Sequence, residues 1–200
     1  MRKYFVSSAV VLLFNGCYLG KTLEQEVHVS VLDVFDVTIN NNGNSNFSAM
    51  NSHEQYRNTF IAGMKNELQS SKIIADGVNP SYEISITSFV ITESTFSETV
   101  NDADSPDNGK VFELTKLELE AGGIVRNIAS GKTKTWMASK DKSEKVTNSR
   151  SAGQVITGQN KDRNVYREKE FDQAEVDDLS QSTGRRSAVS MTKIISKDQK

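Results

Sequence analysis

Hydrophobic and polar residues alternate along residues 27–39, directly after a short polar stretch. Val27, Val29 and Val31 fall on one side of an extended chain, and the same side continues to Ile39. Since successive side chains of a strand point to opposite faces, a period of two predicts a β-strand with one face in a core. We therefore expect a strand over residues 27–39.

An amphipathic helix is predicted next, after a loop rich in Asn and Gly at residues 40–46. Ser52 and Gln55 have the spacing of a capping box, in which side chains satisfy N–H groups at the start of a helix. Apolar residues then recur at four-residue steps, at Tyr56, Phe60, Met64 and Leu68. This stripe is typical of a helix packed on a sheet, and Asp76, Gly77 and Pro80 end the helical pattern.

A second strand is predicted from Tyr82, with an interruption in its pattern. Apolar residues alternate as far as Ile86, and the apolar phase then shifts to Phe89 and Ile91. Either a β-bulge, which inserts one extra residue into a strand, or a bend in a long strand would produce this shift.

Two more strands are expected after an acidic loop over residues 98–110. The third begins at Phe112 and continues to Ile128, past a glycine pair at 122–123 that marks a bulge or bend. The fourth runs from about Lys132 to Val146, and a tight hairpin at Ser130 and Gly131 connects the two.

The C-terminal part combines a polar segment with helices. Residues 148–167 show no steady period except for a short strand at 154–157, and we expect this segment to be mobile. One or two helices follow Phe171, divided at Gly184, and the last has an apolar side formed by Ala188, Met191 and Ile195. Together the elements predict a single α+β domain over residues 27–200, with a mostly antiparallel sheet of about four strands and two or three helices on one face.

The first 16 residues have the pattern of a secretory signal peptide. Two basic residues precede an apolar run from Phe5 to Phe14, and the only cysteine, Cys17, follows directly after Gly16. The run is shorter than the roughly 20 residues that span a bilayer, so we expect it to be removed. Residues 17–26 are then a polar tether.

The sequence Leu13-Phe14-Asn15-Gly16-Cys17 resembles the lipobox of bacterial lipoproteins. The resemblance implies that Cys17 is acylated and becomes the first mature residue, although Phe14 and Asn15 depart from the usual lipobox. Two or three acyl chains, at about 0.8 kcal/mol per buried CH₂, would attach the protein firmly to a membrane. The alternative is an ordinary signal peptide in which Cys17 is incidental or a buried thiol.

Composition narrows the classes of function. The 200 residues are 36% hydrophobic and 25% charged, and the formal net charge is −2. These values fit one soluble domain, and no basic field favours a nucleic-acid partner. We expect no cofactor and no metal.

The tetrapeptide at residues 130–133, Ser-Gly-Lys-Thr, is the ending of many phosphate-binding loops. Such a loop needs a first glycine five positions before Gly131, where the chain has Arg126. The residues after Thr133 favour a strand and not the helix that the loop requires, so we interpret the tetrapeptide as a hairpin corner.

Other candidate chemistry is sparse. A serine nucleophile would need a histidine base, and the only histidines are His28, on the polar side of a strand, and His53, at a helix start. Asp102, Asp104 and Asp107 lack the spacing of a calcium loop and indicate a solvated hairpin tip, and Arg185 with Arg186 indicates a solvated helix start, not an anion site. A paired-carboxylate mechanism stays open, because only separation in space decides it.

A family resemblance lies in residues 117–136, above all in Ile124-Val125-Arg126-Asn127, Ala129-Ser130-Gly131-Lys132 and Trp136. This hairpin resembles one found in small envelope lipoproteins. They include the curli-secretion-channel lipoproteins, the peptidoglycan-synthase activator lipoproteins and the N-terminal domain of the Tol–Pal β-propeller protein. Here Ser130 replaces the usual Thr, and two polar residues follow where apolar ones are common.

The resemblance implies a non-enzymatic assembly, scaffold or accessory protein of the bacterial cell envelope. It would be held by lipid in the outer membrane, facing the periplasm, and would bind an envelope protein or peptidoglycan. A subunit of an oligomeric secretion channel is one alternative, and a secreted hydrolase is the other.

Overall fold

The computed structural model describes residues 22–41, 52–148 and 166–199. The elements in these ranges, in chain order, are β1 (Val27–Leu32), β2 (Thr38–Asn41), α1 (His53–Ser70), β3 (Ile73–Ile74), β4 (Tyr82–Thr99), β5 (Val111–Asn127), β6 (Thr133–Ser143), β7 (Lys145–Asn148), β8 (Tyr166–Lys169) and α3 (Gln173–Asp198).

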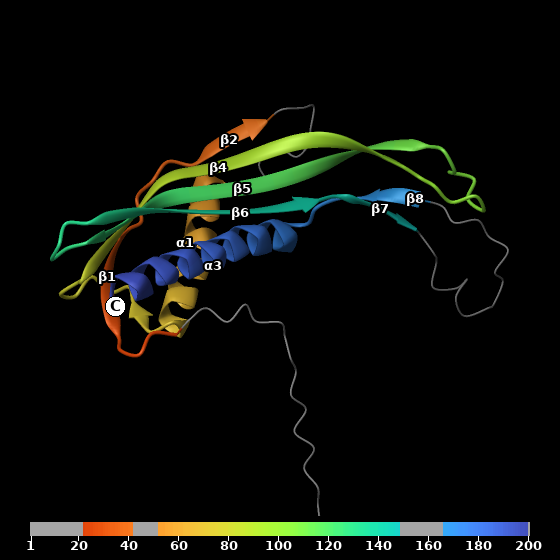
Figure 1. Ribbon diagram of the computed structural model, residues 1–200. Helices are drawn as coiled ribbons and strands as arrows, with labels where there is room; N and C mark the ends of the chain where they lie inside the picture. Colours follow the sequence, from red (N-terminus) through yellow and green to blue (C-terminus); the bar gives the residue numbers. More distant parts are fainter. Residues whose placement is uncertain (1–21, 42–51, 149–165, 200) are drawn as a thin grey trace, which may run out of the picture.

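The main sheet has the strand order β3-β1-β4-β5-β6, and β2 also pairs with β4. Both α1 and α3 lie on one side of it (Figure 1). This confirms the α+β class with helices on one face, but the predicted number of about four strands is too low. The described residues form six strands in this sheet and two more in the separate β7–β8 sheet.

The sheet is mixed, because β1 pairs in parallel with β3 and β4, and β2 pairs in parallel with β4. The chain crosses from β2 through α1 before β4 begins, and such a crossover connection brings the next strand back in the same direction. The β4–β5 and β5–β6 pairs are antiparallel, as predicted for most of the sheet.

The predicted strand over residues 27–39 is divided into β1 and β2. The predicted inward face is nevertheless retained, because Phe35 and Val37 in the gap are buried. The Phe35 ring packs 6.0 Å from the ring of Phe60 on α1 and 5.5 Å from that of Phe89 on β4, between centroids. The chain therefore leaves the strand pairing between β1 and β2 while its apolar side chains stay in the core.

The predicted bulge lies in β4, between Ile86 and Ser88. It faces the glycine pair of β5, where the sequence predicts a bulge or bend, yet β5 itself pairs with β6 without a break. The glycines serve a different purpose, since a Cβ on Gly123 would lie 2.7 Å from the ring of Trp136. The indole of Trp136 therefore occupies the space that a side chain at position 123 would fill.

Helix α1 begins as predicted, with the Ser52 side chain accepting a hydrogen bond from the Gln55 N–H at 3.1 Å. Its predicted stripe is buried. Helix α3 is one continuous helix, so the predicted division at Gly184 is wrong. Gly184 lies where α3 crosses α1, and a Cβ there would collide with the carbonyl oxygen of Phe60.

The far halves of β4 and β5 extend beyond the two helices to a tip at residues 100–110, with β7 and β8 beside them (Figure 1). The predicted fourth strand breaks at Glu144, where β6 ends and β7 begins. β8 was not predicted, and the short strand expected at 154–157 lies outside the described residues.

Candidate functional site

A groove of about 380 Å³ lies where the end of β6, the β7–β8 hairpin and the start of α3 meet. It is lined by residues 141–145 and by Lys169, Phe171 and Glu175. The volume is within the range of sites for small ligands, roughly 300–1,000 Å³. Six of the eight lining residues are charged, and the lining also includes the buried Phe171.

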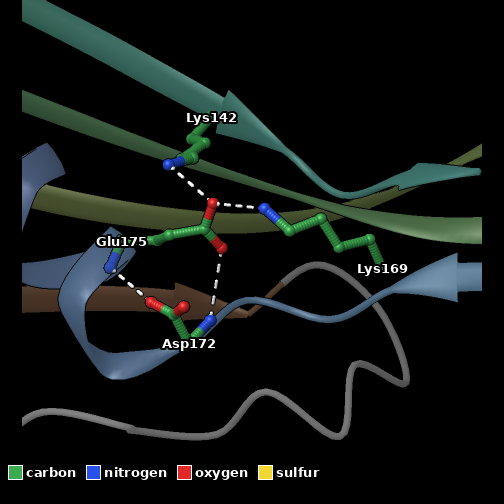
Figure 2. Close-up of polar contacts among 4 residues, drawn as sticks. All are labelled: Lys142, Lys169, Asp172 and Glu175. Atoms are coloured by element: carbon green, nitrogen blue, oxygen red, sulfur yellow. Dashed lines mark hydrogen bonds and ion pairs between the residues drawn. The ribbon is translucent and has the colours of Figure 1, made fainter. Parts of the chain in front are cut away.

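Glu175, in the first turn of α3, holds three segments together at this groove (Figure 2). Its oxygen Oε1 accepts a bond from Lys169 of β8 at 2.7 Å and pairs with Lys142 of β6 at 3.0 Å. The other oxygen, Oε2, accepts a bond from the Asp172 N–H at 3.3 Å, and the Asp172 carboxylate accepts the Glu175 N–H at 2.8 Å. This reciprocal pair is a capping box, which satisfies N–H groups at the helix start.

The two lysines change the acidity of Glu175. Hydrogen bonds from Lys169 first and Lys142 second lower the pKa of Glu175 to about 2. The same contact with Glu175 raises the pKa of Lys169. Glu175 and Lys169 are therefore both charged at neutral pH, and their ionic contact persists over the whole physiological range.

Lys145 adds a third cation to the groove. It is the direct cross-strand partner of Lys169 in the β7–β8 hairpin, so both side chains share one face. Among the described residues, Lys145 makes no hydrogen bond or ion pair through its side chain. The groove therefore has three ammonium groups, of which Glu175 is bound to two.

The other carboxylates of the groove have partners elsewhere. Asp141 pairs with Lys116 of β5 at 3.3 Å. The Glu144 carboxylate accepts the Thr115 N–H at 3.0 Å, and burial raises the pKa of Glu144, with the nearby Glu168 adding to the effect. Both carboxylates are therefore bound to groups on β5.

The histidines lie far from this groove along the chain. His28 on β1 contacts Asp76, with 3.0 Å between Nδ1 and Oδ2, and both side chains are more than a third exposed. The N–H of Val78 and then His28 lower the pKa of Asp76. His53 is an exposed residue at the start of α1. Within the described ranges, no hydroxyl is hydrogen-bonded to either imidazole.

The acidic loop is more buried, and makes more contacts, than the solvated tip that the sequence predicts. Asp107 is only 6% exposed, and its carboxylate contacts Lys110 at 2.6 Å and accepts the N–H of Tyr166 at 2.9 Å. Asp102 accepts the Tyr166 hydroxyl, also at 2.9 Å. These carboxylates thus hold β8 against the β4–β5 tip, and residues 22–41, 52–148 and 166–199 contain no cluster of three or more potential metal ligands.

The remaining candidates have structural contacts. Gly131 has φ +68° and its N–H donates to the Asn127 carbonyl at 2.9 Å, which confirms the hairpin corner. Arg185 and Arg186 lie in the middle of α3, so the predicted helix start is wrong. Arg186 donates to the Ser139 carbonyl on the free edge of β6 at 2.9 Å.

Cys17 and the signal peptide lie outside the described residues. The described part of the chain contains no helix of the length and apolar character needed to span a bilayer. Leu23, within the predicted tether, is 5% exposed, and its N–H donates to the Ser71 carbonyl at 3.2 Å. Leu23 is therefore part of the folded body.

The ionic groove was not found from the sequence. The spacing of Asp172 and Glu175 matches a capping box and would have located the start of α3, as Ser52 and Gln55 located that of α1. The lysines that bind Glu175 come from β6 and β8, and no local pattern connects these strands with the helix.

No protein-family model matches this chain. No curated protein matches it in sequence either. Among solved structures, it aligns with a neuraminyllactose-binding hemagglutinin homolog from Helicobacter pylori at 9% identity and a TM-score of 0.43, over 98% of this chain and 94% of that one. A minor lipoprotein from Acinetobacter baumannii aligns at 10% identity and a TM-score of 0.35, over 86% and 94%.

The PelC dodecamer from Paraburkholderia phytofirmans aligns at 10% identity and a TM-score of 0.35, over 85% of this chain and 92% of that one. Likeness at this level identifies neither a shared family nor a shared function.

Proposed function

We propose that this protein is a lipid-anchored lipoprotein of the bacterial cell envelope that acts as a non-enzymatic assembly, scaffold or accessory component. The observation that carries the proposal is the position of Cys17, six residues before Leu23, which is the first buried residue in the part of the chain that the structure describes. A chain of six residues extends at most about 20 Å. If Cys17 is acylated, the folded body is held within that distance of the membrane.

The shape of the body supports an accessory role. The far halves of β4 and β5, with their tip at residues 100–110, form an arm. The tip of this arm lies at the other end of the molecule from β1 (Figure 1). The attachment at Leu23 precedes β1 by only a few residues, so the arm and its groove are remote from it along the sheet. We propose that this end contacts an envelope protein or peptidoglycan, from an anchor in the outer membrane that faces the periplasm.

Maturation in cells tests the anchor. Cys17→Ser should leave a larger, unacylated precursor in the soluble or inner-membrane fraction, and globomycin should have the same effect on the wild-type chain. Labelled palmitate should enter the wild-type protein and not the variant, because Cys17 is the only cysteine. Thr22→Ser, close to Cys17 and just before the buried residues, is the matched control and should mature normally. Normal processing of Cys17→Ser would refute the proposal.

The accessory role needs its own test. Crosslinking in intact cells through the arm, followed by identification of the captured molecule, should give the same envelope partner in repeated experiments. Substitutions in the arm should abolish crosslinking to that partner and leave membrane anchoring intact. This result would show that partner binding and membrane attachment depend on different parts of the chain.

A further inference from the structure

The last strand of the main sheet, β6, has one edge without a neighbouring strand. It pairs with β5 on one side and ends the strand order on the other. The Lys132 carbonyl faces β5, because it accepts the Asn127 N–H at 2.9 Å. Since successive residues of a strand direct their backbone groups to opposite sides, the odd-numbered residues from Thr133 to Ser143 direct theirs away from β5. This free edge runs along all 11 residues of β6 and is a template for a further strand.

Helix α3 covers two carbonyl groups of the free edge. Arg186 donates to the Ser139 carbonyl at 2.9 Å, and the Ser190 hydroxyl donates to the Met137 carbonyl at 3.4 Å. The spacings match, because four residues of a helix rise about 6 Å and two residues of a strand about 6.8 Å. Among the described residues, no group accepts the N–H of Met137 or Ser139, so α3 caps only the carbonyl groups.

We infer that the free edge of β6 is a pairing surface for the same edge of a second copy of this chain, and that Arg186 and Ser190 hold it closed. An opposing strand needs the carbonyls of Met137 and Ser139 as acceptors for its own N–H groups, so the two α3 side chains compete with it. The inference concerns α3 and β6 alone and does not depend on the lipid anchor or on the proposed accessory role.

A second copy fits this edge because two β6 strands can pair antiparallel about a two-fold axis, each supplying the same backbone groups. Charge then selects between the registers centred on the two capped residues. An axis at Ser139 places Lys134 opposite Glu144 of the second copy. An axis at Met137 places Lys134 opposite Lys140, and like charges directly opposite each other are destabilising. We therefore expect the axis at Ser139.

Analytical ultracentrifugation tests the inference on the mature chain, residues 17–200. Every sample carries Cys17→Ser, which excludes acylation and a disulfide between copies. Without further changes the chain should sediment as a monomer. Arg186→Ala combined with Ser190→Ala should form a dimer, with an association constant raised roughly tenfold or more. Arg185→Ala is the matched control and should stay monomeric, because Arg185 donates to Gln181 of its own helix and not to β6.

Ser139→Pro separates strand pairing from aggregation of a damaged fold. Proline lacks the outward N–H that a second copy would bind, and β5 does not use that N–H. Added to the double alanine variant, Ser139→Pro should restore the monomer. Without Ser139→Pro, amide exchange at Met137 should be slower in the dimer than in the monomer.

Three outcomes would overturn the inference. The double alanine variant could stay monomeric at every concentration, or its dimer could survive Ser139→Pro. The chain could also already dimerise through β6 with Arg186 and Ser190 in place.

Discussion

Gly63 of α1 and Gly184 of α3 lie at the crossing of the two helices, and each faces the backbone of the other helix. A Cβ at Gly63 would collide with the carbonyl oxygen of Gln181, and a Cβ at Gly184 would collide with that of Phe60. The Ser180 hydroxyl donates to the Tyr56 carbonyl at 2.9 Å near this crossing. Two small residues therefore set how closely the helices approach each other.

Alanine at either glycine should lower the free energy of unfolding. Ala favours an isolated helix by about 1 kcal/mol over Gly. Here the collision with backbone forces the helices apart, so we expect a net loss of about 1–3 kcal/mol for Gly184→Ala. Urea denaturation measures this change, and the exposed Lys193→Ala should stay within about 0.5 kcal/mol of the wild type. A Gly184→Ala protein as stable as the wild type would contradict this account of the crossing.

A second close contact joins Gly123 and the only tryptophan, Trp136, which are cross-strand partners. Gly123→Ala would press against the ring and against the Ser85 carbonyl. We expect a loss of about 1–3 kcal/mol and a change in tryptophan fluorescence. Gly122→Ala is the matched control with a smaller effect, because its nearest neighbour is the Ser88 hydroxyl, at the end of a movable side chain. Equal effects at both glycines would argue against a specific role for the ring.

Features that depend on neighbouring residues could be predicted from the sequence. The stripe of α1, the bulge after Ile86 and the corner at Gly131 are all set by local spacing, and each is found. The alternation before Ile39 correctly predicted buried residues such as Val29 and Val37, but the strand itself is divided. The glycine at 184 was misinterpreted because local rules connect glycine with helix ends. Its role depends on Phe60, more than a hundred residues earlier.

Pairing over long distances could not be predicted in the same way. Nothing in the sequence of β1 specifies a parallel neighbour, and the polar residues around Tyr166 show no period that predicts β8. The groove has the same origin, since Glu175 meets Lys142 and Lys169 only after the sheet, the hairpin and α3 have come together. The capping box of the groove lies within four consecutive residues and follows a local pattern. The ion pairs of Glu175 join distant segments and follow none.

Tyr166 should control how firmly the β7–β8 hairpin is held. Tyr166→Phe removes the hydrogen bond to Asp102 and keeps the one from its N–H to Asp107. Amide hydrogen exchange in residues 145–148 and 166–169 should become faster, and the global free energy of unfolding should fall by about 0.5–1.5 kcal/mol. Tyr82→Phe removes the comparable bond to Asp198 at the other end of the sheet, so exchange in the hairpin should not change. Unchanged exchange in Tyr166→Phe would show that other contacts hold the hairpin.

Glu175 should make the stability of the protein depend on pH. Its pKa is lowered from the ordinary value of 4.5 to about 2 in the folded protein. Because the folded value is the lower one, the ionic contacts stabilise the fold fully above pH 4.5, and this contribution is lost as pH falls from 4.5 towards 2.

Glu175→Gln should therefore lower the free energy of unfolding by about 1–2 kcal/mol at pH 7, and the difference from the wild type should shrink on acidification. Urea denaturation at pH 7, 4 and 3 measures both effects. Glu83→Gln is the control, because it breaks only the exposed pair with Arg126, and such surface pairs contribute little, on the order of 0.5 kcal/mol. A Glu175→Gln deficit that stays constant down to pH 3 would mean that the side chain stabilises α3 through packing, and that its charge between Lys142 and Lys169 contributes nothing.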